Sequence, residues 1–439
     1  MKVSFPKTPS HAFWLSFILC TIAGLVIIYP VSAITGLSQS FGGRGNDGYI
    51  EIARNIVAGN GYVFEPDGPA VFHRPPLYPV FLVPTVLMPQ ALERPFLILS
   101  QSFLAGWICF FLFSIAKSLF NKTVAKVALA ILLCNPWLYW HIKNPMTAII
   151  QCFLYMLLIY IFIRIVNGIN RPANKPFLMD FIFFGIAGAA LSLVHAAMLP
   201  AFALYIAAAV FWIFHKRHFA ILKYLFLSCL LSLLCILPWT IRNGLVTDSF
   251  VPVSSGGGLA YFNGNVHWRN IGRTSQLPGE TYIDASLRAL GIEGKEKDMI
   301  HFKGFTDFQL DRFANKKMAE DIKQRPGDFI KKFILNAIEY YFPVFVYKFR
   351  AFSDFTKEEL LLTVYHLILW IFAVIGFVLS ESVYRARSLM FLAAIFFYAI
   401  WYFPFATGFI GHNLYTFATI PLLAILSAGL FSSRRFPRT

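Results

Sequence analysis

Long apolar runs separated by short polar connections make up most of this chain. Runs of about 20 apolar residues can cross the roughly 30 Å hydrocarbon core of a bilayer as helices. The pattern therefore predicts an α-helical polytopic membrane protein with about ten transmembrane helices. The predicted spans cover residues 12–36, 96–120, 124–140, 146–166, 177–194, 197–214, 219–240, 359–380, 389–407 and 415–432.

Two segments depart from this pattern. Residues 76–90 are apolar but short for a span and rich in proline, so we expect non-helical, half-embedded backbone that is buried in protein or lines a cavity. Residues 241–358 form the one sizeable polar stretch. Its opening, VPVSSGGGLAYFNGN, is typical of strands and turns. Later stretches, DFQLDRFANKKMAEDIKQ and PGDFIKKFILNAIEYYF, are typical of helices.

The predicted organisation therefore has three parts. Residues 1–240 form an N-terminal transmembrane module whose first polar loop is 37–79. Residues 241–358 form a smaller mixed domain, and residues 359–439 form the C-terminal transmembrane helices.

Composition supports a membrane protein, and the distribution of charge excludes a nucleic-acid-binding protein. Hydrophobic residues make up 57% of the chain and charged residues 14%, against roughly 25% charged in soluble domains. The net charge of +16 could indicate nucleic-acid binding, but the basic residues gather on one set of loops, which excludes it. That set holds Lys2, Lys7, Lys122, Lys126, Arg164, Arg171, Lys175, Lys216, Arg217, Lys223, Arg385, Arg387, Arg434, Arg435 and Arg438.

Orientation follows from this asymmetry, because Lys and Arg are enriched in cytoplasmic loops. The short opposite connections contribute only Lys143. We therefore expect both termini in the cytoplasm and the 37–79 and 241–358 segments outside. The first apolar stretch is too long for a signal-peptide core and lacks a clear cleavage site, so a retained helix is expected. All six cysteines lie in apolar runs, which predicts no disulfide framework in the outer loops.

Charge is concentrated in GNDGYIEIARNIVAGNGYVFEPDGPAVFHRPPLYP, residues 45–79. Residues 48–58 read as a short amphipathic helix, with Asp47, Glu51 and Arg54 at i, i+4 and i+7. Asp47 has two interpretations that do not exclude each other. It is a helix N-cap, or it is a general base at the membrane interface, a role worth roughly 10²–10⁴-fold in rate.

Two arginine motifs follow. In His73-Arg74-Pro75-Pro76 the prolines predict extended backbone where the chain returns to the bilayer. Arg74 there either binds a phosphate through its guanidinium fork or reaches towards lipid headgroups. The second motif is Pro238-Trp239-Thr240-Ile241-Arg242-Asn243. Its Trp239 and Arg242 are either anchors at the membrane interface, or Arg242 is a second cation beside the same phosphate.

Other polar residues rank lower. His195 lies in an apolar segment, where a histidine either hydrogen-bonds between helices or serves function. No HExxH, CxxC or histidine cluster assigns a metal by spacing. The remaining candidates are His141, Lys143 and Asn144 at one outer connection and His412 and Tyr415 at the last.

In their order along the chain, these motifs resemble the GT-C superfamily of polyprenyl-phosphate-dependent glycosyltransferases. The resemblance is greatest to family 39, which includes protein O-mannosyltransferases and bacterial aminoarabinose transferases. It rests on Asp47-Gly48-Tyr49 with Ile52-Ala53-Arg54, on His73-Arg74-Pro75-Pro76-Leu77-Tyr78-Pro79, on Pro238-Trp239 with Arg242-Asn243, on SFVPVSSGGGLAYFNGN and, more loosely, on His412-Asn413-Leu414-Tyr415 with Pro421.

The resemblance implies a GT-C fold and transfer of a hexose or pentose from a polyprenyl-phosphate donor, with inversion, on the outer face of the plasma (bacterial inner) membrane. It implies Asp47 as the catalytic base, and Arg74 and Arg242 suit the donor phosphate. The substrate-binding candidates are Tyr49, Glu51, Arg54, His73, Tyr78, His412 and Tyr415.

The acceptor stays open between a lipid, a glycan and a protein. Relatives often carry an acidic residue at the third outer connection, whereas HIKNPMTA has none, so a divalent metal also stays open and no other cofactor is expected. The rival class is a multi-pass lipid or solute transporter or flippase. It predicts ionisable residues near the bilayer midplane, for which His195 is the one candidate; an O-antigen ligase or polymerase is a second rival.

Overall fold

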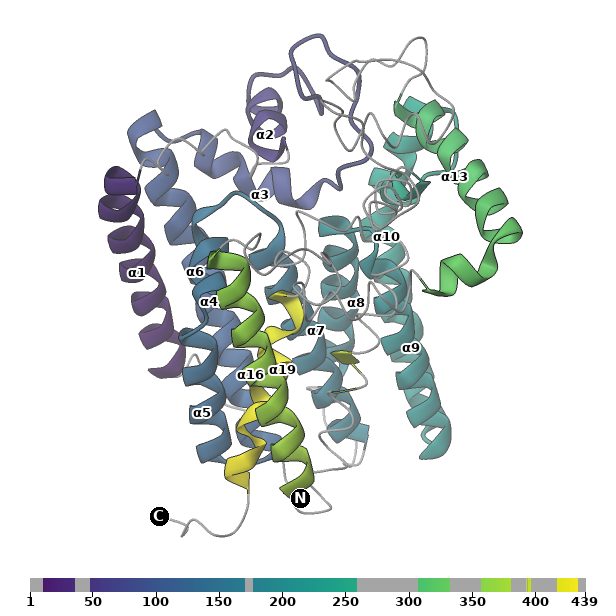
Figure 1. The fold of residues 1–439 in the computed structure, drawn as a ribbon. Helices are drawn as coiled ribbons and strands as arrows, with labels where there is room; N and C mark the ends of the chain where they lie inside the picture. The colour runs from purple at the N-terminus through teal and green to yellow at the C-terminus, as the bar shows by residue number, and fades with distance from the viewer. Residues whose placement is uncertain are drawn as a thin grey trace. The chain divides into compact units, whose positions relative to one another are not determined.

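A computed structural model of the protein (Figure 1) describes residues 11–35, 48–169, 177–258, 307–331, 357–379, 392, 394–395 and 417–432. These residues are mostly helical. The α-helices are α1 His11–Thr35, α2 Tyr49–Val57, α3 Leu77–Val86, α4 Gln90–Leu119, α5 Lys122–Leu133, α6 Pro136–Lys143, α7 Ala148–Ile169, α8 Phe177–Val194, α9 Met198–His215, α10 Leu222–Thr247, α13 Asp307–Gln324, α16 Lys357–Leu379 and α19 Ile420–Ser427. Short 3₁₀ turns are η2 Phe219–Ile221, η4 Phe417–Thr419 and η5 Ala428–Ser432.

Most of the helices lie where the apolar runs of the sequence predicted them. Helix α8 occupies the predicted 177–194, and α1, α7, α9 and α16 begin and end within three residues of prediction. In the described part of the chain, four helices are long and apolar enough to cross a membrane, or five if the bent pair α5–α6 is one span. The total of ten spans stays a prediction, and nearly all of the predicted span 389–407 lies outside the described residues.

Asn135 and Pro136 break the predicted span 124–140. Helices α5 and α6 meet there at 56°. The Asn135 side-chain oxygen accepts a hydrogen bond from the Trp137 N–H at 2.9 Å, and Pro136 occupies the first turn of α6. Since proline cannot donate within a continuing helix but suits a first turn, a new helix begins here. The prediction of one unbroken span is therefore wrong.

The proline-rich segment after Arg74 is also more regular than expected. Residues 77–86 form α3, with Pro84 inside it. Pro76 has φ −80° and ψ −24°, which is helical rather than extended, and it forms the N-cap of α3. The proline ring pre-sets the φ that a first helical turn needs. Extended backbone at Pro76 and non-helical backbone over 77–86 were thus wrong expectations.

The secondary structure of the polar stretch 241–358 was predicted correctly in some parts and wrongly in others. Helix α10 continues to Thr247 instead of ending at 240, and no strand occurs between 248 and 258, contrary to the strand reading of VPVSSGGG. Helix α13 coincides with DFQLDRFANKKMAEDIKQ, and residues 326–331 are helical as predicted.

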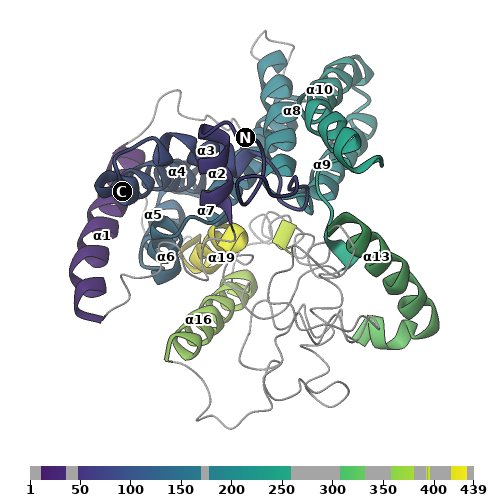
Figure 2. The same cartoon turned by 90° about the horizontal axis from the view of Figure 1, so that it is seen from above.

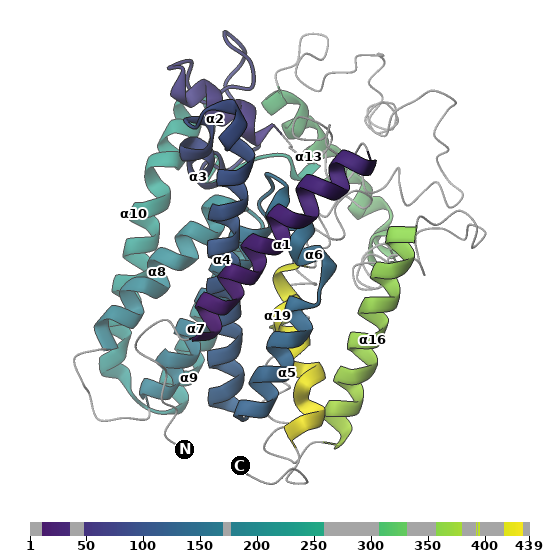
Figure 3. The ribbon, with the colours of Figure 1, turned by 90° about the vertical axis from the view of Figure 1, so that its left-hand side faces the viewer.

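The chain divides into two compact units. The first comprises 1–253, 370–395 and 417–439, and the second comprises 254–369 and 396–416. Within the first unit, α4 packs against α1, α5 and α7, while α8 packs against α7 and α10. Figure 3 shows α1 slanting across α4 and α6. Helices α4 and α7 are mostly buried, whereas α9 and α10 expose most of their apolar surface, as lipid-facing helices do.

Helices α8 and α10 approach closely because their contact residues are small. A Cβ on Gly185 would lie 2.4 Å from the Ser228 backbone oxygen. The Ser232 hydroxyl donates to the Gly185 carbonyl at 2.8 Å. Small residues and hydroxyl bonds of this kind are the usual means by which helices associate in apolar surroundings. The contact fixes the base of α10, whose other end carries Arg242.

Gln101 ties α4 to the end of α6. Its side chain is fully buried. Its Nε2 donates to the carbonyls of His141, Ile142 and Asn144 at 3.3, 3.0 and 2.9 Å. The last carbonyls of a helix have no intrahelical partner, so this amide replaces the missing N–H groups and positions the connection between α6 and α7.

Replacing Gln101 with Met should lower the free energy of unfolding by about 1–3 kcal/mol, because buried carbonyls lose their partner. Denaturant unfolding of the purified protein in detergent measures this. Ser118→Ala is the control, because that hydroxyl donates to the Ile115 carbonyl of its own helix. Equal stability of both variants and the native protein would contradict the assignment.

Candidate active site

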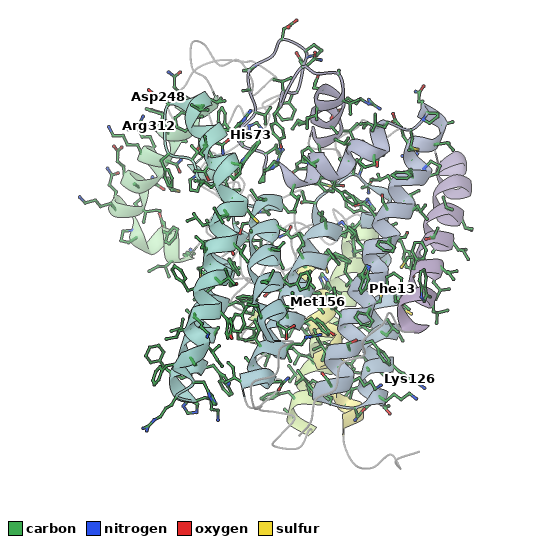
Figure 4. The ribbon with its side chains drawn as sticks, turned by 180° about the vertical axis from the view of Figure 1, so that it is seen from behind. Phe13, His73, Lys126, Met156, Asp248 and Arg312 are labelled. Carbon is green, nitrogen blue, oxygen red and sulfur yellow. The ribbon has the colours of Figure 1, made fainter. Side chains whose placement is uncertain are left out.

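The polar loop and its neighbours lie at one end of the first unit. Helices α2 and α3 sit at this end (Figures 1 and 2). Figure 4 shows His73 and Asp248 at the same end and Lys126 at the opposite end. That these two ends face opposite sides of the membrane stays a prediction from the sequence.

Helix α2 begins at Gly48 as N-cap, with φ +77° and no side-chain cap. The Ile52 N–H donates to the Gly48 carbonyl at 3.1 Å. The interpretation of Asp47 as this N-cap is therefore wrong, and Asp47 itself lies outside the described residues. A Cβ at Gly48 would lie 2.2 Å from Phe64 Cε1. Both the backbone angle and the packing thus demand glycine next to Asp47.

The loop after α2 folds back as a small hairpin. Val63 and Ala70 form an antiparallel bridge, and the Val71 N–H donates to the Tyr62 carbonyl at 2.9 Å. The buried Asn55 side chain donates from Nδ2 to the carbonyls of Val63 and Phe64 at 3.2 and 2.8 Å. Helix α2 therefore holds the hairpin.

Arg74 is held through both its backbone and its side chain. The Tyr62 hydroxyl donates to the carbonyls of Arg74 and Pro75 at 3.1 and 3.0 Å. The Arg74 guanidinium lies over the Tyr49 ring, 5.3 Å from its centroid. Tyr49 in turn meets the buried Tyr78 edge-to-face at 5.1 Å. Aromatic faces attract cations, so the Tyr49 ring orients the Arg74 guanidinium.

Arg242 reaches the same hairpin from α10. Its Nη1 donates to the Val71 carbonyl at 2.6 Å. Its guanidinium carbon lies 5.4 Å from the Tyr62 ring centroid and 4.7 Å from that of Trp239. The Trp239 indole N–H donates to Val253 O at 2.7 Å, which orients the ring. No carboxylate of the described ranges forms an ion pair with Arg242, so its charge is open to an anionic ligand.

Two histidines lie close to Arg74. The His73 ring packs at a tilt against Phe64, with 5.4 Å between the ring centroids, and His195 lies in the connection between α8 and α9. Burial, together with the nearby Arg74 charge, lowers the pKa of His73 to about 3 and that of His195 to about 4. Both imidazoles are therefore neutral at physiological pH and can offer a hydrogen bond without adding charge.

Arg54 has a different partner. Its Nη2 forms an ion pair with Glu93 of α4 at 2.9 Å, and the Arg54 side chain is about half exposed. The pair ties α2 to the first turn of α4. Glu51 lies partly buried on α2. Arg54 thus acts as a link between helices in this structure, and its substrate-binding role stays a prediction.

The structure brings together residues that the sequence named separately. Tyr78, Tyr49 and Arg74 contact one another in turn, with His73 next to Arg74, and Tyr62 connects the Arg74 backbone to Arg242. His412 and Tyr415, like Asp47, lie outside the described residues. Tyr62 was not selected from the sequence. It is an uncharged aromatic residue in the glycine-rich loop GNGYVF, and this was the one feature that could have drawn attention to it. In the described part of the chain, no group of three or more His, Cys, Asp or Glu residues could hold a metal.

Comparisons with known proteins give distant likenesses. No protein-family model matches the chain. No curated protein matches it significantly. Its structure is similar to the crystal structure of ArnT from Cupriavidus metallidurans bound to undecaprenyl phosphate, with 14% identity, a TM-score of 0.40, and coverage of 96% of this chain and 78% of that one. For ArnT in the apo state the identity is 13%, the TM-score 0.35 and the coverage 95% and 78%. Likenesses at these TM-scores carry no argument about activity.

Acidification should weaken the fold through His73. Because its pKa in the folded protein is about 3, below the usual 6.5, the unfolded chain binds the proton first as pH falls below 6.5. Stability present above pH 6.5 is therefore lost on the way to pH 3, and the loss at pH 5 is up to about 2 kcal/mol.

Unfolding at pH 7.5 and pH 5 measures this loss. His73→Gln should be less sensitive to pH than the native protein, and His218→Gln, at an exposed position, should behave like the native protein. Identical pH dependence of His73→Gln and the native protein would contradict the neutral state of the partly buried His73.

Proposed function

We propose that this chain is an integral-membrane glycosyltransferase of the GT-C type. It transfers a sugar from a polyprenyl-phosphate donor to an acceptor on the outer face of the membrane, with inversion. The convergence of Arg74 and Arg242 on Tyr62 carries the proposal. Two arginines that are far apart in sequence contact the same tyrosine, Arg74 through its backbone carbonyl and Arg242 through its guanidinium. This contact lies beside the helix that follows Asp47, at one end of helices apolar enough to lie in a bilayer.

The reaction requires two events at the anomeric carbon. The acceptor hydroxyl forms a new bond to this carbon from one side, and the bond to the phosphate oxygen breaks on the other, which inverts the configuration. The hydroxyl proton passes to the Asp47 carboxylate. The bonding electrons leave with the polyprenyl phosphate.

The two arginines suit the leaving group. Its phosphate gains negative charge as the bond breaks, and cations already in place stabilise that charge most. Among the described residues, a carbonyl and two aromatic rings orient Arg242, and no carboxylate pairs with it. This supports a role for the Arg242 guanidinium in binding the phosphate.

The remaining candidates surround this centre. Tyr49 and Tyr78 line the Arg74 side, and the neutral His73 can hydrogen-bond to a phosphate oxygen or a sugar hydroxyl. Glu51 and Arg54 lie on the helix next to Asp47. The apolar α3 is suited to the lipid tail of the donor, because its residues 77–86 carry no charge.

Replacing Asp47 with Asn should abolish sugar transfer, because the amide cannot take the acceptor proton; a loss of about 10²–10⁴-fold or more is expected for a general base. Membranes are supplied with a panel of radiolabelled polyprenyl-phosphate sugars, and labelled product is counted. Asp67→Asn, the same change at the exposed tip of the same loop, is the matched control.

Near-normal transfer by Asp47→Asn would remove Asp47 as the base. If no donor in the panel is used by the native protein, the enzyme assignment is wrong. Movement of labelled lipid across the bilayer without transfer would favour the transporter or flippase class instead.

Replacing Arg74 or Arg242 with Ala should lower transfer by about 10²-fold, the usual cost of losing one preorganised charge-stabilising group. Steady-state transfer from the donor that the panel identifies measures this loss. Arg312→Ala, at an exposed position of α13, should leave transfer unchanged. Unchanged donor binding and turnover in both site variants would overturn the phosphate assignment.

A further inference from the structure

We infer that Tyr62 is a positioning residue that sets the separation of the two phosphate-binding arginines. The inference rests on the proposed function of Arg74 and Arg242. Tyr62 touches both through different parts of one side chain: its hydroxyl meets the backbone of Arg74, and its ring meets the guanidinium of Arg242.

The hydroxyl holds a backbone that has few donors of its own. Pro75 and Pro76 follow Arg74, and prolines lack the N–H that would anchor a loop by backbone hydrogen bonds. The Tyr62 hydroxyl instead donates to the carbonyls of Arg74 and Pro75. Burial raises the pKa of Tyr62 above its usual value, so the hydroxyl keeps the proton that it donates.

The Tyr62 ring contacts the guanidinium of Arg242. It lies 5.4 Å from the guanidinium carbon and meets Trp239 edge-to-face at 4.8 Å. Two aromatic rings against one guanidinium restrict its rotation and stabilise its charge.

The backbone of the hairpin makes a third link. The Tyr62 carbonyl accepts from the Val71 N–H, and the Val71 carbonyl accepts from Arg242 Nη1. Tyr62 and Arg242 are therefore connected through Val71 as well as directly. A shift of Tyr62 would move both ends of the phosphate site together.

Fixed separation matters because like charges repel. A scaffold that fixes both arginines during folding removes the need to bring them together during binding, which is the basis of preorganisation.

The test measures binding of a polyprenyl phosphate that carries no sugar to the full-length protein in nanodiscs. Tyr62→Phe keeps the ring and loses two hydrogen bonds, so affinity should fall about 3–10-fold. Tyr62→Leu also loses the ring contact, so affinity should fall about 30-fold or more. Tyr139→Phe is the matched control, since that hydroxyl also donates to a backbone carbonyl, Leu133 O, elsewhere in the unit.

A double-mutant cycle separates positioning from general stability. Once Arg242→Ala has removed the guanidinium, the extra loss of Tyr62→Leu over Tyr62→Phe should vanish, whereas a purely structural residue would keep it. Affinities of both Tyr62 variants equal to native, with Arg74→Ala and Arg242→Ala weakened, would overturn the inference alone. No binding by the native protein would overturn the proposed function and the inference with it. If Tyr62→Leu fails to fold, the affinity of Tyr62→Phe for the polyprenyl phosphate decides: a fall supports the inference, and an affinity equal to native overturns it.

Discussion

Side chains that donate hydrogen bonds to loop carbonyls hold the α2–α3 end of this protein in place. Gln101 serves the end of α6, and Asn55 serves the hairpin after α2. Asn243 and Trp239 both donate to Val253 O after α10. A buried carbonyl without a partner costs about 1–3 kcal/mol. Because each donor comes from a helix, the loops take their positions from the helix framework, and the candidate site depends on this.

The site itself follows from one member of this set. Arg242 donates to Val71 O, a residue 171 positions away along the chain. The bond joins the end of α10 to the first polar loop, and Tyr62 links the same loop to the backbone of Arg74. Among the described residues, aromatic rings rather than carboxylates flank Arg242, and Arg74 lies over Tyr49. These rings orient the two guanidinium groups.

Helix positions were largely readable from apolar runs, since a helix that faces lipid or other helices must be apolar over its whole length. The bend at Asn135-Pro136 had a visible signal, because an Asn followed by Pro is a typical helix start. Helix α3 was missed because its prolines at 79 and 84 suggested irregular backbone. Hydropathy also ended α10 too early, since Arg242 and Asn243 are polar yet lie within the helix.

By itself, the sequence determined that the protein is helical and membrane-like, that its charge gathers in the first polar loop, and that Arg74 and Arg242 are candidate phosphate ligands. These conclusions depend only on composition and on short stretches of the sequence. Only the tertiary structure decided that Gly48 rather than Asp47 caps α2, and that Tyr62 joins the two arginines. Such contacts link residues that no local pattern pairs, because they depend on how α10 lies against the hairpin. An uncharged tyrosine in a loop carries no periodic signal, and its role becomes visible only with its neighbours in place.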